Sequence, residues 1–276
     1  MAFGQAQYVT QEAPAELAFS VCTLVASDEK YRRLLASFER LGFHDGNAEF
    51  IALDNRTKNR FDGYQALRSV FPRCRGEFIL YTHDDIELID EGADDLLAVL
   101  RDLERRDPRW TVAGNAGWSM AGKERLVLHL RDPHGSTRDA PRPIEVQALD
   151  ENLMILPRAR MVFPSLDLEG FHLFGADLCL QGRLAGGRAY VIPFYVQHHS
   201  GGQASAALEE SRARFAAKYA ALSIPARVRT PAARLYIGAR GRLLQVIDGI
   251  ADRIDAVRRR IAWAAAGRRL AANRDE

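Results

Sequence analysis

The sequence has no uncharged apolar run near the roughly 20 residues that a membrane-spanning helix needs. Its first residues, Met1 to Gln7, have neither the basic start nor the apolar core of a signal peptide. Cysteine is scarce, with three residues at positions 22, 74 and 179 that have no metal-site spacing. These absences exclude a disulfide scaffold and predict a cytoplasmic protein with buried thiols.

Charge of one sign is also lacking. The 38 Lys and Arg residues are nearly balanced by 36 Asp and Glu residues, so the net charge is +2. That value is too small to indicate a nucleic-acid partner. The apolar content of 47% is typical of a globular protein, and 276 residues suffice for one large domain or one domain with an appendage.

A glycine-rich phosphate loop is missing as well. The segment after the first predicted strand reads Ala26-Ser-Asp-Glu-Lys30 and contains no glycine. This excludes the dinucleotide fingerprint of a Rossmann dehydrogenase, and the sequence has no P-loop. The same absence argues against a nucleotidyltransferase, which shares this type of sheet.

Strand and helix patterns alternate along the first part of the chain. Residues 19–26 form a continuous apolar run, which predicts a strand covered on both faces. Further strands are predicted at residues 49–53, 77–81 and 110–116, with helices between them at 28–41, 63–71 and 91–106. This alternation predicts an α/β fold with a mostly parallel, doubly wound central sheet.

The pattern changes after residue 116. Residues 125–130 and 144–149 alternate weakly around a turn-rich segment, which predicts a hairpin or a mobile flap. A helix at 174–185, a strand at 188–193 and a helix at 204–222 follow. We therefore expect three parts: a loose arm over residues 1–17, the main domain over 18–225 and a basic amphipathic helical tail over 226–276.

The most informative stretch is Phe78 to Leu88. An apolar strand runs directly into metal-seeking side chains, namely His83, Asp84, Asp85 and Glu87. In open α/β sheets, ligands bind outside the carboxyl ends of the strands. Carboxylates placed there can hold a divalent cation against a diphosphate. The alternative is the acidic start of a helix, since Asp and Glu favour the first turn.

Four polar features then follow in order along the chain: Asp54-Asn55, His83-Asp84-Asp85, Asp150, and a helix at Asp177 followed by His198-His199. Their order resembles that of GT-A glycosyltransferases in or near glycosyltransferase family 2, especially bacterial members with a His-x-Asp metal motif. Phe171 to Leu180, which reads Phe-His-Leu-Phe-Gly-Ala-Asp-Leu-Cys-Leu, resembles a later segment of those sequences. The resemblance covers residues 19–202 and implies a GT-A, Rossmann-like fold.

The resemblance also implies roles in binding the donor. Asp54 matches the carboxylate that contacts the base or ribose, although an ordinary turn aspartate is the alternative; Asn55 and Val25 are neighbouring candidates. Asp85 matches the metal-binding aspartate, with His83 at the place of the motif's first aspartate and Asp84 in its variable middle. The metal would be Mg²⁺ or Mn²⁺, because carboxylate and phosphate oxygens suit hard cations. It would neutralise the departing nucleoside diphosphate.

His198 matches a histidine that lies near the metal and the diphosphate. The side chains of His198 and His199 point in opposite directions if the backbone is extended, so one of them is expected to be structural. A satisfied surface histidine is the alternative for both.

The general base is not settled by the sequence. The resemblance places Gly175 where the catalytic aspartate of inverting relatives stands. The rival candidates are Asp177, His172 and Asp150, with Glu151 as a further one. A base must reach the acceptor hydroxyl within hydrogen-bonding distance, which sequence cannot measure. We favour Asp177 as the base and Asp150 as the residue that orients the acceptor.

The tail has an apolar stripe at helical a/d spacing, made of Leu243, Ile247, Ile250, Ile254, Val257 and Ile261. It predicts packing on the protein's own core, a homodimer, or a helix on an anionic membrane surface. Asp248, Asp252 and Asp255 dilute the positive charge of the arginines and weaken the membrane alternative.

Together these features predict a metal-dependent, inverting glycosyltransferase. It would move a sugar from a nucleotide-sugar donor to a glycan or lipid-linked acceptor, in bacterial surface polysaccharide or glycolipid synthesis. It would be cytoplasmic, with peripheral contact at the inner membrane as an option. Because Gly175 replaces the expected base, a catalytically silent relative that binds nucleotide-sugar or glycan as a scaffold remains the alternative.

Overall fold

The computed structural model describes residues 15–119, 125–201, 206–220, 227–231, 233–238 and 240–272, with side chains of the last helix to residue 260. The chain divides into two compact units, residues 1–211 with 230–232, and residues 212–229 with 233–276. Most of the predicted loose arm, residues 1–14, lies outside the described residues, and Leu17 already begins the first strand. The predicted boundary near residue 225 stays a prediction.

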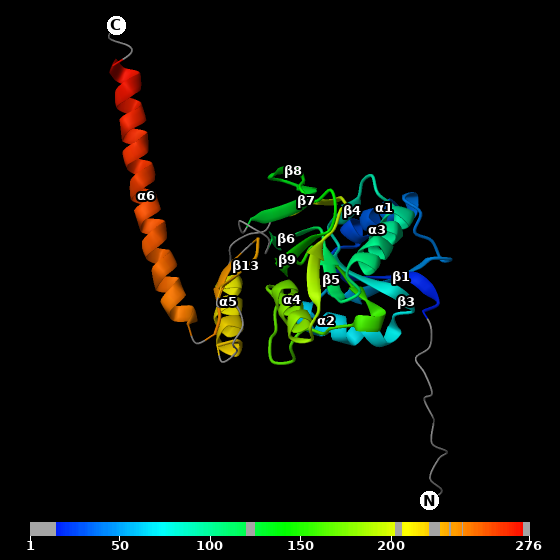
Figure 1. The fold of residues 1–276 in the computed structure, drawn as a ribbon. Helices are drawn as coiled ribbons and strands as arrows, with labels where there is room; N and C mark the ends of the chain where they lie inside the picture. Colours follow the sequence, from blue (N-terminus) through cyan, green and yellow to red (C-terminus); the bar gives the residue numbers. More distant parts are fainter. Residues whose placement is uncertain are drawn as a thin grey trace, which may run out of the picture. The chain divides into compact units, whose positions relative to one another are not determined.

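The first unit begins with three parallel strands in the order β2-β1-β3. Their bounds are β1 Leu17–Val25, β2 Ala48–Asp54 and β3 Gly76–His83, and the helices that follow them are α1 Asp28–Arg40, α2 Gly63–Val70 and α3 Ala93–Arg106. Ser27 caps α1, because its side chain accepts from the Lys30 amide. The ribbon in Figure 1 shows these strands side by side.

The sheet continues beyond β3 with strands of mixed direction. β10 (Leu153–Pro157) runs antiparallel between β3 and β5 (Trp110–Gly114). The remaining order is β11 (Arg188–Val191), β9 (Ile144–Leu149), β6 (Ala116–Ser119), β7 (Leu126–Asp132), β12 (Val196–His198) and β4 (Ile86–Leu88), with β8 (Gly135–Arg138) beside β7. Helices α4 (Phe174–Leu184) and α5 (Ala206–Lys218) complete the unit's elements, although α5 continues past residue 211 into the second unit.

This sheet curls on itself. β4 begins only three residues after β3 ends, yet it pairs with β12 at the other end of the strand order. The curl also brings β4 against α1, where the Leu88 amide donates to Ser37 Oγ at 3.1 Å and Arg40 donates to the Leu88 carbonyl at 2.9 Å. As a result, His198 of β12 lies next to the carboxyl end of β3.

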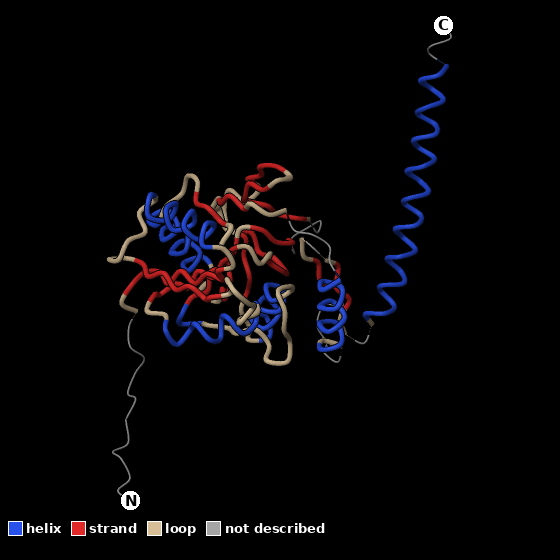
Figure 2. The backbone as a smooth tube through the Cα atoms, turned by 180° about the vertical axis from the view of Figure 1, so that it is seen from behind, coloured by secondary structure: helices blue, strands red, loops and turns tan. Residues whose placement is uncertain are grey.

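Helices cover both faces of the sheet. α1 and α3 lie on one face and α2 and α4 on the other, as both Figure 1 and the reverse view in Figure 2 show. The core under α1 and α3 contains an apolar cluster that includes Phe38, Phe78, Leu100 and Trp110. On the opposite face, the ring of Phe174 from α4 lies 6.0 Å from that of Tyr64 in α2, centroid to centroid. The predicted α/β fold class is confirmed.

Two details differ from the predictions. The sheet is mixed rather than mostly parallel. Strands β2, β1 and β3 pair in parallel, as do β5 with β11 and β7 with β12, while the other pairs are antiparallel. The predicted hairpin or flap at the turn-rich segment is a hairpin between β7 and β8, and residues 144–149 are not part of it, because β9 pairs with β6 and β11. The three cysteines are buried and free, as predicted, and Cys22 Sγ lies 3.6 Å from Cys74 Sγ.

The second unit contains a short hairpin, β13 (Arg227–Arg229) and β14 (Arg234–Tyr236), and the long helix α6 (Gly241–Ala272). Tyr236 donates to Asp248 at 3.0 Å and Arg234 pairs with Asp252 at 2.8 Å, so the hairpin holds one face of α6. Among the described helices, none combines the length and apolarity needed to cross a bilayer.

Candidate functional site

A metal-ligating cluster lies where β3 ends. His83 is the last residue of β3, Asp85 lies in the turn before β4, and His198 ends β12. One potential ligand atom from each residue lies within 4.8 Å of the other two. Asp85 Oδ1 is 3.6 Å from His198 Nε2, and the two imidazole rings are 6.5 Å apart, centroid to centroid. The curl of the sheet therefore assembles three residues that the sequence analysis named for metal binding.

The cluster has the electrostatics of a cation site. Asp85 is buried, and its Oδ1 has no hydrogen-bond partner among the described residues. Burial opposes its ionisation, but His198, His83, the Ser200 hydroxyl and Lys30 together hold the pKa of Asp85 below its usual value. Burial lowers the pKa of His83, which leaves that ring neutral at pH 7, the form that binds metals. A buried, ionised carboxylate oxygen without a hydrogen-bond donor fits a divalent cation.

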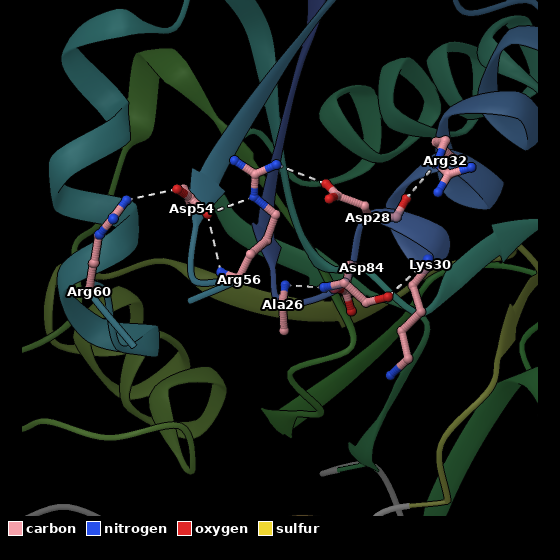
Figure 3. A network of polar contacts seen from close by, with 9 residues as sticks. Ala26, Asp28, Lys30, Arg32, Asp54, Arg56, Arg60 and Asp84 are labelled. Atoms are coloured by element: carbon pink, nitrogen blue, oxygen red, sulfur yellow. Dashed lines mark hydrogen bonds and ion pairs between the residues drawn. The ribbon is translucent and has the colours of Figure 1, made fainter. Parts of the chain in front are cut away.

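Asp84 has a different position. Its Oδ2 accepts from the amides of Ala26 and Ser27, both at 2.7 Å, at the start of α1 (Figure 3). A carboxylate at a helix N-terminus is stabilised by the helix dipole and by otherwise unsatisfied amides. Asp84 thus ties the β1–α1 turn to the end of β3.

The two adjacent histidines point to different partners. His199 Nε2 lies 2.8 Å from Glu87 Oε1, outside the cluster, whereas His198 Nε2 lies 2.9 Å from Ser200 Oγ. The sequence analysis did not single out the Ser200 hydroxyl, which orients the His198 ring. No sequence signal marked Ser200, because its contact with His198 depends on how the chain turns after β12.

The end of β2 is crowded with internal contacts. Asp54 Oδ1 accepts from the Arg56 side chain at 2.8 Å and Oδ2 from Arg60 at 2.7 Å, as Figure 3 shows. Hydrogen bonds from Arg56 lower the pKa of Asp54 to about 2. Asn55 is buried, donates to the Phe61 carbonyl and accepts two loop amides, so its side chain organises the loop after β2.

The backbone amide of Asn55 also donates to the backbone carbonyl of Val25, a buried residue at the end of β1. Of the predicted nucleotide contacts at this end of the sheet, only Asp54 is appreciably exposed, with 34% of its side chain accessible.

Asp177 is structurally engaged rather than accessible. It is fully buried in the first turn of α4, and its two oxygens accept from the Ser165 amide at 2.6 Å and the Ser165 hydroxyl at 2.8 Å. This carboxylate holds the loop before α4. A base must contact the acceptor, and a side chain with no exposed surface has no route to one.

His172 and Asp150 are both half-buried. The carbonyl of His172 accepts from Tyr64, and its neighbour Leu173 begins α4 with a φ of 68°. Asp150 Oδ2 accepts from Asn152 at 2.5 Å. The Asn152 carbonyl in turn accepts from the His83 amide at 3.3 Å, so Asp150 lies on the loop beside the metal cluster.

Glu151 occupies the same loop and reaches toward α4. Its Oε1 accepts from the Gly175 amide at 3.3 Å. A Cβ added at Gly175 would stand 2.7 Å from the Leu149 carbonyl and 3.4 Å from Glu151 Cγ and Oε1. Phe174, next to Gly175, places its ring 6.5 Å from that of His83. Glu151 therefore fills the space where a side chain at position 175 would begin.

The surroundings of Glu151 keep its carboxyl protonated at neutral pH. Burial, reinforced by the charge of Asp150, raises the pKa of Glu151 to about 8, although the amides of Gly175 and Leu173 act in the opposite direction. Groups with strongly shifted pKa values in a polar cleft are candidates for acid–base chemistry. Sequence analysis named Glu151 only as a further candidate base. Its contact with Gly175 joins two segments that are distant in the sequence, so the sequence alone did not reveal it.

The chain is 42% identical over 217 residues to a protein of Fuscovulum blasticum named "ATP synthase subunits region ORF 6", covering 77% of this chain and 87% of that protein. It belongs to the same family as that protein, whose name states no activity. No family model matches the chain.

Three solved structures are similar over about three quarters of this chain. The first is GalNAc-T7 with UDP, GalNAc and Mn²⁺, with a TM-score of 0.49 and 11% identity over 76% of this chain and 52% of that chain. The second is the Pyrobaculum calidifontis mannosyltransferase PcManGT with GDP-Man and Mn²⁺, with a TM-score of 0.44 and 13% identity over 74% of this chain and 63% of that chain. The third is S. aureus TarS, with a TM-score of 0.46 and 14% identity over 76% of this chain and 41% of that chain. This chain thus spans less than two thirds of each. At these TM-scores, the functional assignment rests on the site itself.

Proposed function

We propose that this chain is a metal-dependent glycosyltransferase of the GT-A fold that uses a nucleotide-sugar donor. The observation that carries the proposal is the buried Asp85 Oδ1, which has no hydrogen-bond partner among the described residues and lies between His83 and His198 at the carboxyl end of β3. This is the edge at which α/β sheets bind their ligands. A cation held there would be coordinated by the diphosphate oxygens of a nucleotide sugar that lies across the ends of β1 and β3.

The donor atoms favour Mn²⁺ over Mg²⁺. Two imidazole nitrogens and one carboxylate oxygen make a mixed set, whereas Mg²⁺ is bound almost entirely by oxygen. Three protein ligands leave open positions for a diphosphate. When bound, the cation supplies Lewis-acid stabilisation of the departing nucleoside diphosphate.

Glu151, rather than Asp177, is the proposed base. In an inverting transfer, the acceptor oxygen attacks the anomeric carbon while the bond from that carbon to the diphosphate breaks. The base takes the acceptor's hydroxyl proton in the same step. Glu151 lies beside the metal cluster through Asn152 and His83, and its pKa of about 8 suits proton transfer near neutral pH.

This assignment also weakens the alternative of a silent scaffold protein. That alternative rested on Gly175 at the place of the expected base. Because the Glu151 carboxyl lies against Gly175, the chain retains an acid–base group there. Asp150, held by Asn152, remains the proposed residue for orienting the acceptor. A glycan or lipid-linked acceptor and a role in surface polysaccharide or glycolipid synthesis complete the proposal.

The decisive test is calorimetric binding of UDP and GDP to the full chain with Mn²⁺, Mg²⁺, Fe²⁺ or EDTA. Fe²⁺ is included because two histidines and a carboxylate also hold that ion. We expect Mn²⁺-dependent binding that Asp85→Ala abolishes. Asp45→Ala, an exposed carboxylate in the turn after α1, serves as the matched control and should bind as the parent does.

Unchanged Mn²⁺-dependent binding by Asp85→Ala would overturn the metal site. Binding of Fe²⁺ without any nucleotide dependence would overturn the donor assignment. Nucleotide binding without transfer or hydrolysis across a panel of nucleotide sugars would favour the scaffold alternative.

A further inference from the structure

Helix α6 exposes an apolar stripe. Six apolar side chains share one face of the helix, and each is 48–61% exposed: Leu243, Val246, Ile247, Ile250, Ile254 and Val257. At about 100° per residue they cover a face roughly 100° wide. Such a face on a helix that is otherwise charged requires a partner, since large exposed apolar patches mark interaction sites.

Arginines border this stripe on both sides. Arg253 and Arg260 follow one edge and Arg258 the other, and all three are exposed. By helical geometry each lies roughly 20–40° from the nearest apolar residue. Long arginine side chains in this position extend along an apolar surface and place their charge at its boundary.

The acidic residues of α6 lie on the opposite face. Asp248 is held by Arg227 and Tyr236, and Asp252 by Arg234, all within the second unit. Asp255 pairs with Arg258 at 3.6 Å. Asp248 and Asp252 therefore do not dilute the positive border of the stripe, whereas Asp255 pairs with Arg258 of that border.

The border argues against a second copy of α6 as the partner. In a coiled coil, the positions that flank the apolar seam carry charges that pair across the interface. Here those positions hold Arg253, Arg258 and Arg260. Either parallel or antiparallel pairing of two copies would place arginine opposite arginine.

We propose that α6 is an interfacial helix that docks this chain on an anionic lipid surface. The stripe enters the boundary between headgroups and acyl chains, and the flanking arginines bind the lipid phosphates. The helix lies in the plane of the surface and does not cross it. This inference is independent of the proposed transferase activity.

The test is co-sedimentation of the full chain with vesicles of phosphatidylcholine containing phosphatidylglycerol, against vesicles of phosphatidylcholine alone. Binding is expected with the anionic vesicles and at least tenfold weaker with the neutral ones. Arg253→Gln with Arg260→Gln should weaken binding about 25-fold, at about fivefold per arginine. Glutamine keeps the helix propensity, so this pair tests charge rather than folding.

Ile250→Asp should weaken binding by about 10- to 100-fold, because one apolar side chain no longer enters the lipid. Leu166→Asp is the matched control, since Leu166 is 84% exposed in the first unit, and Arg105→Gln with Arg106→Gln on α3 controls for lost charge. Equal binding to neutral vesicles, no binding to anionic ones, or a dimer in light scattering that Ile250→Asp abolishes would each overturn the proposal.

Discussion

The carboxyl ends of β2 and β3 both present an aspartate, and they differ in what surrounds it. Asp54, after β2, is partly exposed and pairs with Arg56 and Arg60. Asp85, after β3, is buried, and its Oδ1 has no hydrogen-bond partner among the described residues. An aspartate with two cations of its own is already neutralised, whereas a buried carboxylate between imidazoles is stabilised by binding an added cation. The contrast supports the proposal that Asp85, rather than Asp54, binds the metal ion.

The two candidate bases, Asp177 and Glu151, also differ in what surrounds their carboxyl groups. Asp177 is fully buried, and both of its oxygens accept from Ser165. Glu151 accepts from the Gly175 amide at 3.3 Å and from the Leu173 amide, yet burial raises its pKa to about 8. A carboxylate whose oxygens are already bonded stabilises the fold. One whose pKa lies near neutral pH can exchange a proton.

The largest effect is expected from Glu151→Gln. Loss of a positioned general base lowers turnover by about 10²–10⁴-fold, with donor binding nearly unchanged, because the proton moves only in the transition state. Turnover of the parent should rise as pH increases through about 8, since Glu151 must lose its proton to act. The measurement is a pH profile of single-turnover transfer with the donor identified by calorimetry.

Two neighbouring acids face Glu151, namely Asp150 on its own loop and Cys179 on α4. Asp150→Asn should therefore lower the pH at which turnover reaches half its maximum, because the charge that raises the pKa of Glu151 is removed, and the rise of turnover with pH should remain. Full turnover by Glu151→Gln, with the same pH midpoint, would return the search to Asp150 and His172 and break the contrast with Asp177.

An intermediate effect is expected from Asp177→Asn. The amide cannot accept at both positions, so one Ser165 donor loses its partner, at a cost of about 1–3 kcal/mol of unfolding free energy. Turnover of the folded variant should stay within about a factor of ten of the parent, far from the loss of a base. Urea unfolding monitored by tryptophan fluorescence supplies the stability. A variant of parental stability but with hundredfold lower turnover would reverse the two roles.

The smallest effect is expected from Asp54→Asn. Hydrogen bonds from Arg56 depress the pKa of Asp54 from 3.8 to about 2, so its contribution to stability is present above pH 4 and lost as pH falls through about 2. At pH 7 the melting temperature should change little, because this carboxylate is solvent-screened. Thermal melts between pH 2 and 5 should show a small difference from the parent above about pH 4 that disappears as pH falls through about 2. A large loss of stability at pH 7 would show that the arginine contacts hold the fold.

Local patterns in the sequence determined much of the fold. The apolar run at 19–26, the helix capped by Ser27 and the alternation up to residue 106 correspond to β1 through α3. They were predictable because a strand covered on both faces and an amphipathic helix each leave a periodic signature within one segment. The short strands β4, β10 and β12 were missed, although β5 and β11, of similar length, were predicted.

Only the tertiary structure decided which polar residues meet. The sequence offered His83, Asp85 and His198 as metal candidates, and the curl of the sheet is what brings them within 4.8 Å. Burial and hydrogen-bond partners then separated Asp177 from Glu151, and Asp54 from Asp85. The physical reason is that a carboxylate's role depends on desolvation and on the donors around it. Both are set by segments far apart in the chain, so residue type and spacing alone do not determine them.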